Sequence, residues 1–113
     1  MRAGQAIYVD ACSACHARDG AGVARMFPAL RHSAAVQSRD PTSLIRVVLQ
    51  GAQSVATEKA PTGPGMPAFG WKLTDRQVAD VLTYIRNSWG NAGRAVTTSE
   101  VHGARQSLAQ RTD

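Results

Sequence analysis

The sequence contains 113 residues, of which 43% are hydrophobic but only 5% are aromatic, and its formal charge at pH 7 is +5. This length indicates one domain, whose core would be thin with so few large side chains. No run approaches the about 20 apolar residues of a membrane-spanning helix. The basic charge suits acidic partner surfaces. Nucleic-acid binding is not indicated, because the arginines are scattered and lack an aromatic stacking platform.

Residues 3–16 are predicted to form the first helix, because apolar side chains recur there at helical spacing: Ile7, Tyr8, Ala11 and Cys15. Gly4 lies four residues before Tyr8, so another helix can approach the chain closely at this point. Gly20 and Gly22 then indicate a loop.

The helix contains Cys12-Ser13-Ala14-Cys15-His16, which is the C-x-x-C-H attachment signature of a c-type haem. On a helix, Cys12 and Cys15 share a face and can reach the two vinyl groups of one porphyrin edge. His16 lies one turn beyond Cys12 and can coordinate the iron. One covalent haem c is therefore the expected cofactor. It would supply the missing apolar bulk, so we expect the chain without haem to be poorly folded.

Other uses of a C-x-x-C pair fit the sequence less well. Zinc needs four ligands, and the histidines His16, His32 and His102 form no H-x₃₋₅-H pair. A thioredoxin-like dithiol requires a βαβ setting, which the sequence does not indicate. A structural disulfide would not require the adjacent histidine.

The next motif is Phe27-Pro28-Ala29-Leu30. A histidine that binds haem iron needs an acceptor for its second ring N–H, and the carbonyl of Pro28 is our candidate. Phe27 and Leu30 are expected to pack in the core, and they can also pack on the haem ring.

Asp40 and Pro41 have the residue types of a helix N-cap and first position, and Gly51 is a stop signal. The intervening helix has a broad apolar face, and we expect Val48 on it to form part of the haem pocket. Residues 52–65 are predicted to be a loop, because glycine, proline and threonine break any periodicity.

Met66 follows in a turn bounded by Gly65 and Pro67. Methionines of a core are usually adaptable packing residues on helices, so a thioether that coordinates iron suits this position better. Met26 is the rival ligand, but it lies only ten residues after His16. His32 and His102 are interpreted as surface or packing histidines.

The last core helix is predicted to begin after Thr74, which forms a capping box with Gln77, and to end at residues 89–91. Its apolar stripe is expected to cross the first helix near Gly4 and Tyr8. A second capping box, Thr97-x-x-Glu100, predicts a short helix to about residue 110. We expect a haem domain over residues 1–91 and an extension over residues 92–113, either an appended surface element or a frayed tail.

Three landmarks now stand in order: Cys12-x-x-Cys15-His16, Phe27-Pro28-x-Leu30 and Gly65-Met66-Pro67 before a capped helix. Over about residues 3–90 the sequence resembles a class I cytochrome c. The resemblance implies an all-α fold of about three core helices around one haem, His16/Met66 ligation and electron transfer. Residues 66–71 and 78–91 resemble the last haem domain of multihaem cytochrome subunits from bacterial membrane-bound alcohol and sugar-acid dehydrogenases, which carry three C-x-x-C-H motifs where this sequence has one.

We therefore predict an electron-transfer module rather than an enzyme, in which electrons pass near the Cys12 and Cys15 thioethers. Its expected partners are a dehydrogenase subunit or domain and a terminal acceptor, and it would be peripheral to the membrane through a partner. Two alternatives stay open, a peroxidase-like haem enzyme and a gas-binding sensor, both of which need a releasable sixth ligand.

Covalent haem in this family is attached outside the cytoplasm, so we expect a periplasmic protein or one at the periplasmic face of the bacterial inner membrane. Residues 1–2 lead into the first helix without an apolar leader. An export signal is therefore expected to have been removed, or to precede this segment in a longer parent. The module would be either an excised terminal domain or a free carrier.

Overall fold

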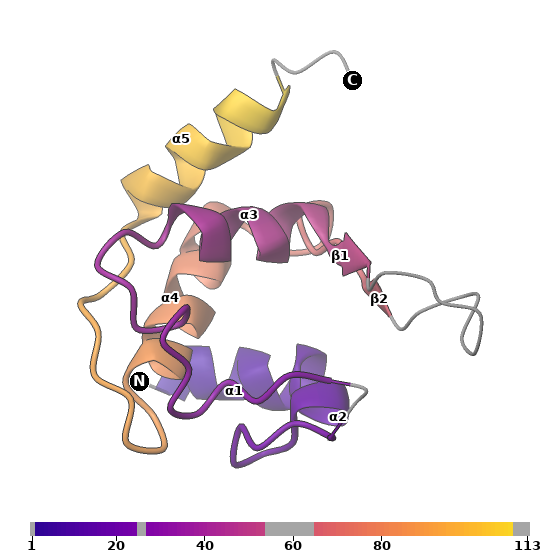
Figure 1. The fold of residues 1–113 in the computed structure, drawn as a ribbon. Coiled ribbons are helices and arrows are strands. Elements are labelled where there is room, and N and C mark those ends of the chain that lie inside the picture. Colours follow the sequence, from indigo (N-terminus) through magenta and orange to yellow (C-terminus); the bar gives the residue numbers. More distant parts are fainter. Residues whose placement is uncertain (1, 25–26, 54–64, 110–113) are drawn as a thin grey trace.

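The computed structural model describes residues 2–24, 27–53 and 65–109, which are mainly helical (Figure 1). In chain order the elements are α1 (Arg2–Ala11), α2 (Ser13–His16), α3 (Thr42–Gln50), β1 (Ala52–Gln53), β2 (Gly65–Met66), α4 (Asp75–Arg86) and α5 (Thr98–Ala109). The predicted all-α class is confirmed. Within the described ranges, no helix is long and apolar enough to cross a bilayer.

The helix predicted over residues 3–16 is interrupted at Cys12. There φ is −119°, which separates α1 from the single turn of α2. The interruption is local, because the amide of His16 still donates to the carbonyl of Cys12 at 3.1 Å. The C-x-x-C-H motif therefore occupies one turn that is set off from α1.

The helix α3 begins one residue later than predicted, at Thr42, with Pro41 in the N-cap position. Asp40 still provides the capping oxygen, because its carboxylate accepts from the Thr42 amide at 3.0 Å and from the Thr42 hydroxyl at 2.6 Å. Gly51 ends the helix with φ of 84°, as predicted. Ile45, Val48 and Leu49 are buried on its inner face.

The prediction of a continuous loop over residues 52–65 is wrong at its two ends. Ala52 pairs with Met66, and Gln53 pairs with Gly65, in a short antiparallel ladder. Met66 therefore lies on β2 and not in a turn. Strands of two residues have no hydrophobic periodicity, which is why the sequence pattern does not reveal them. Residues 54–64 of that predicted loop lie outside the described part of the chain.

Helices α1 and α4 pack against each other at Gly4, as predicted. A Cβ atom added to Gly4 would collide with the backbone of Asp80 and with the Cβ of Tyr84. The capping box of Thr74 and Gln77 is also present. The end of α4 differs from the prediction, because the helix stops at Arg86 and the chain turns through left-handed conformations at residues 89–90.

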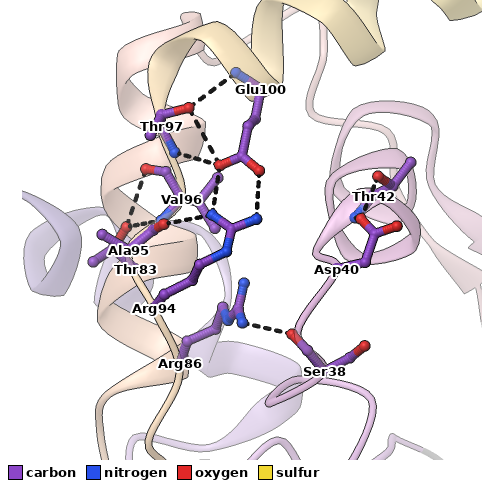
Figure 2. Close-up of polar contacts among 10 residues, drawn as sticks. All are labelled: Ser38, Asp40, Thr42, Thr83, Arg86, Arg94, Ala95, Val96, Thr97 and Glu100. Atoms are coloured by element: carbon purple, nitrogen blue, oxygen red, sulfur yellow. Dashed lines mark hydrogen bonds and ion pairs between the residues drawn. The ribbon is translucent and has the colours of Figure 1, made fainter.

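Helix α5 packs against α3 and α4, and its side chains Val101 and Ala104 are 0% and 9% exposed. The described part of the extension, Thr98–Ala109, is therefore a docked helix. Figure 2 shows how its first turn is fixed: Glu100 accepts from the Thr97 amide at 3.0 Å and pairs with both terminal nitrogens of Arg94, at 3.0 and 2.7 Å. Residue 110, the predicted end, lies outside the described residues.

Helices α1, α3, α4 and α5 share one hydrophobic core. Its buried apolar side chains are Tyr8, Val36, Ile45, Val48, Leu49, Leu73, Val78, Ala79, Val81, Leu82, Ile85, Val96, Val101 and Ala104. Complete burial of one such aliphatic or aromatic side chain is worth about 1.5–3 kcal/mol. In Figure 1, α2 and the β1–β2 ladder both lie on the right-hand side of the view.

Candidate haem site

The two cysteines of the motif are free thiols that are partly buried. Burial, with a further contribution from neighbouring Cys15, raises the pKa of the Cys12 thiol to about 11. Reactive dithiol pairs depend on a lowered thiol pKa, which makes the thiolate available at neutral pH. With its raised pKa, Cys12 is not the activated thiol that such a pair requires.

The imidazole of His16 contacts the carbonyl of Pro28, with Nδ1 and the oxygen 2.9 Å apart. A carbonyl only accepts, so Nδ1–H is the donor and the lone pair of the ring lies on Nε2. Such a bond fixes the tautomer and orientation of a histidine that binds metal through Nε2. The contact predicted from the sequence is present.

The loop between these two residues folds back on itself through two glycines. The amide of Gly22 donates to the carbonyl of His16 at 2.9 Å, and the amide of Leu30 donates to the carbonyl of Gly20 at 2.7 Å. Both glycines have positive φ, 71° and 69°. A Cβ on Gly22 would lie 2.7 Å from the Pro28 carbonyl oxygen. The close approach that brings Pro28 to His16 thus requires glycine here.

Two aromatic residues hold the chain just after His16. The hydroxyl of Tyr8 donates to the carbonyl of Ala17 at 2.5 Å, and the indole of Trp89 donates to the carbonyl of Arg18 at 3.1 Å. Their rings lie 5.0 Å apart, centre to centre. Sequence reasoning assigned Tyr8 to the core and Trp89 to a helix end, and it missed both contacts.

Asn91 is a further residue whose role the sequence did not reveal. It is 6% exposed. Its Nδ2 donates to the carbonyls of Leu30 and Ile85, both at 3.0 Å, and its Oδ1 accepts from the His32 amide at 2.6 Å. One buried amide thereby joins the loop after Pro28 to the end of α4.

The second half of the predicted site lies on α3 and β2. Met66 is partly buried against the core, as are Leu30 and Cys12. Val48 is 8% exposed, and its carbonyl accepts from the Phe69 amide at 2.9 Å. Phe27 is partly buried, whereas Pro28 is exposed. The rival ligand Met26 lies outside the described residues.

The structure brings His16 and Pro28 together as one group; of the second group, Val48 lies in the hydrophobic core and Met66 packs against it. No hydrogen bond between described residues joins the two groups. A zinc site is not formed either, since the described chain contains no cluster of three His, Cys, Asp or Glu side chains that could hold a metal. Partly buried thiols at C-x-x-C spacing and an oriented imidazole fit a covalent haem, and the half-buried thioether supplies a soft donor.

Comparison with known proteins agrees with this chemistry. The cytochrome c family model matches residues 1–89. This chain belongs to the cytochrome c family. It is a haem c domain of the electron-transfer type, and the relatives support that function over the peroxidase and sensor alternatives.

The relatives include the cytochrome c subunit of gluconate 2-dehydrogenase from Pantoea cypripedii. It is 46% identical over 86% of this chain and 22% of its own length. The cytochrome c subunit of a quinone alcohol dehydrogenase from Gluconobacter oxydans is 41% identical over 91% of this chain and 22% of its own length. Cytochrome c-552 from Thermus thermophilus is 33% identical over 79% of this chain and 70% of its own length.

The chain spans about a fifth of the length of the dehydrogenase subunits that it matches. It is therefore similar to one haem domain of such a subunit. The resemblance to the cytochrome subunits of alcohol and sugar-acid dehydrogenases is confirmed.

Proposed function

We propose that this chain transfers single electrons through a haem c attached at Cys12 and Cys15, with His16 and Met66 as axial ligands and the chain itself performing no substrate chemistry. The observation that carries the proposal is the 2.9 Å hydrogen bond from His16 Nδ1 to the Pro28 carbonyl. It leaves Nε2 as a basic, oriented donor, which is what a permanent axial ligand requires.

The residues of the site have separate roles in this proposal. The bound haem supplies the one-electron couple of its iron. Met66 is a soft donor that favours the reduced state and raises the reduction potential. Phe27, Leu30 and Val48 contribute apolar surface that excludes water. With both His16 and Met66 holding the iron, little would have to rearrange when its charge changes.

The proposed electron donor is a dehydrogenase, and the proposed acceptor is a respiratory electron carrier. Support comes from the gluconate and alcohol dehydrogenase subunits, which match most of this chain at 46% and 41% identity. Because haem is attached covalently outside the cytoplasm in this family, the proposed location is the periplasm or the periplasmic face of the inner membrane, where the protein would be held peripherally through its partner. Its formal charge of +5 favours an acidic docking surface.

Met66→Ala tests the ligand assignment in holo-protein produced in a host that attaches haem covalently. The parent is expected to show a low-spin spectrum in both redox states and the red absorption band of a methionine–ferric bond. The variant should lose that band, bind carbon monoxide in the ferrous form and have a lower potential. An unchanged spectrum and potential would assign the sixth position to another residue.

The partner assignment is tested by mixing the ferric holo-protein with the catalytic part of a gluconate or alcohol dehydrogenase and its substrate. Reduction is expected only when substrate is present, and its rate should fall as salt screens the charge. If neither dehydrogenase reduces the haem while a chemical reductant does, the proposed donor is wrong.

A further inference from the structure

The side chain of Arg105 on α5 donates hydrogen bonds to the segment that leads from β2 into α4. Its Nε donates to Asp75 Oδ1 at 2.7 Å, one terminal nitrogen donates to the Gly70 carbonyl at 2.5 Å, and the other donates to the Leu73 carbonyl at 2.9 Å. The side chain is 34% exposed. A planar guanidinium is the only side chain that offers donors in this fork geometry.

The same segment is anchored on its other side by α3. The Phe69 amide donates to the carbonyl of Val48 at 2.9 Å, and the Gly70 amide donates to the carbonyl of Leu49 at 3.1 Å. Gly70 is thus joined to α3 through its N–H and to α5 through its carbonyl. A Cβ on Gly70 would lie only 2.8 Å from the Leu49 carbonyl oxygen, so the close approach requires glycine.

Met66 lies four residues before this doubly held glycine. Its own backbone is paired with Ala52, and a Cβ on Gly51 would lie 2.6 Å from the Met66 carbonyl oxygen. The backbone that leaves β2 is therefore held by α3 directly and by α5 through Arg105. Without Arg105, two kinds of contact would remain among the described residues: the backbone bonds from α3 to Phe69 and Gly70, and the contact of His102 on α5 with Asp75 at 3.2 Å.

The position of Arg105 is itself set by burial. Val101 lies one turn earlier on the same face of α5 and is 0% exposed. The first turn of α5 is fixed separately by the Arg94–Glu100 pair and the Thr97 capping box (Figure 2). Because these two sets of contacts involve different residues, the docking of α5 and the hydrogen bonds of Arg105 can be tested independently.

We infer that Arg105 is a positioning residue for Met66, so that the helix beyond the haem domain tightens the bond between the thioether and the iron. The inference rests on the proposed function, in which Met66 is the sixth ligand. Loss of the three Arg105 hydrogen bonds would leave Met66 on β2. It would, however, let this strand move away from the iron more often. An external ligand would then compete more easily for the sixth position.

The experiment titrates the ferric holo-protein with imidazole and records the methionine–ferric band. Arg105→Ala is expected to raise the apparent imidazole affinity about 10-fold and to weaken the band, in line with the effect of losing a group that orients a metal ligand. Arg105→Lys keeps the charge beside Asp75 but cannot reach all three acceptors, so a smaller rise is expected. Hydrogen exchange at the amides of Phe69 and Gly70 should accelerate in both variants.

Arg94→Ala is the matched control, because it loosens the first turn of α5 without touching residues 70–75. It should lower the free energy of unfolding and leave the imidazole affinity unchanged. The inference is overturned if Arg94→Ala raises that affinity as much as Arg105→Ala, or if Arg105→Ala has no effect. Should Arg105→Ala fail to accumulate as holo-protein, unchanged affinity in Arg105→Lys overturns it equally.

Met66→Ala distinguishes failure of this inference from failure of the proposed function on which it rests. If Met66→Ala keeps the methionine–ferric band, the proposed ligand is wrong and the inference falls with it. If Met66→Ala loses the band while both Arg105 variants behave as the parent, only the role of Arg105 is rejected.

Discussion

The hydroxyl of Tyr8 donates a hydrogen bond to the carbonyl of Ala17, 2.5 Å away. Ala17 directly follows His16 and has a positive φ of 67°, a conformation that alanine rarely adopts. Tyr8 is fully buried, and its ring lies 5.7 Å from that of Tyr84 on α4. A residue of the first helix thus fixes the backbone at the point where the chain leaves the proposed haem ligand.

Tyr8→Phe should therefore lower the free energy of unfolding by about 1–2 kcal/mol, because it removes one hydrogen bond and leaves a carbonyl without its partner. Denaturant unfolding of the holo-protein measures the change. Tyr84→Phe is the control, since the described residues offer the Tyr84 hydroxyl no hydrogen-bond partner. An equal loss in both variants would mean that the bond to Ala17 contributes nothing.

The contribution of Tyr8 should also depend on pH at the alkaline end. Burial raises the pKa of Tyr8 above its ordinary value of 10.0. A raised pKa stabilises the neutral form in the folded state, so this stability is present below pH 10.0 and is lost as the pH rises through the folded-state value. The difference between the parent and Tyr8→Phe should shrink above pH 10.0; a constant difference would contradict the assignment.

Local signals in the sequence predicted the parts of the site that depend on neighbouring residues. The C-x-x-C-H spacing and both capping boxes involve residues within one helical turn, so the pattern alone identifies them. The bond from His16 to Pro28 spans twelve residues and was predicted from chemistry, because a ligating histidine needs an acceptor. The roles of Tyr8, Asn91 and Arg105 depend on which backbone groups the fold brings near them, and no local pattern encodes that.

Asn91→Ala should destabilise the protein by about 2–4 kcal/mol, because three backbone groups lose their partner, one in a buried bond and two in part-buried bonds. Asn91→Asp should be no better, since it keeps an acceptor for the His32 amide but faces the carbonyls of Leu30 and Ile85 with a carboxylate. Asn87→Ala, which removes one exposed bond to Thr83, is the control and should cost less than about 1 kcal/mol. Equal costs for Asn91→Ala and Asn87→Ala would refute the bridging role.

Gly4→Ala tests the crossing of α1 and α4. The added methyl group would collide with the Asp80 backbone and the Tyr84 Cβ, so the helices must separate, at a cost of about 1–3 kcal/mol. Gly103→Ala is a matched control within α5, because a Cβ there meets nothing within 4 Å. The free energy of unfolding of this control should rise by about 0.5–1 kcal/mol, because alanine has a higher helix propensity than glycine. A loss at Gly103, or no loss at Gly4, measured by thermal or denaturant unfolding, would contradict the packing.

The docking of α5 should weaken in acid through Glu100. The Arg94 guanidinium, assisted by the Thr97 amide, lowers the pKa of this carboxyl from 4.5 to about 2. A lowered pKa means that the stabilisation is present above pH 4.5 and is lost as the pH falls toward about 2. Glu100→Gln can preserve the capping box, and it removes the charge together with one of the two hydrogen bonds from Arg94, because an amide NH2 cannot accept. The difference in unfolding free energy between the parent and this variant should therefore be largest at neutral pH and should shrink across that acid range.

The double variant Arg94→Ala/Glu100→Gln isolates the ion pair. If the two residues act mainly on each other, the second substitution should add little once the first is made. High salt should reduce the difference between the parent and Glu100→Gln, because Arg94 is 49% exposed and the pair is partly screened. A difference that is as large at the acid end as at neutral pH would show that Glu100 stabilises α5 through its shape and hydrogen bonds rather than through its charge.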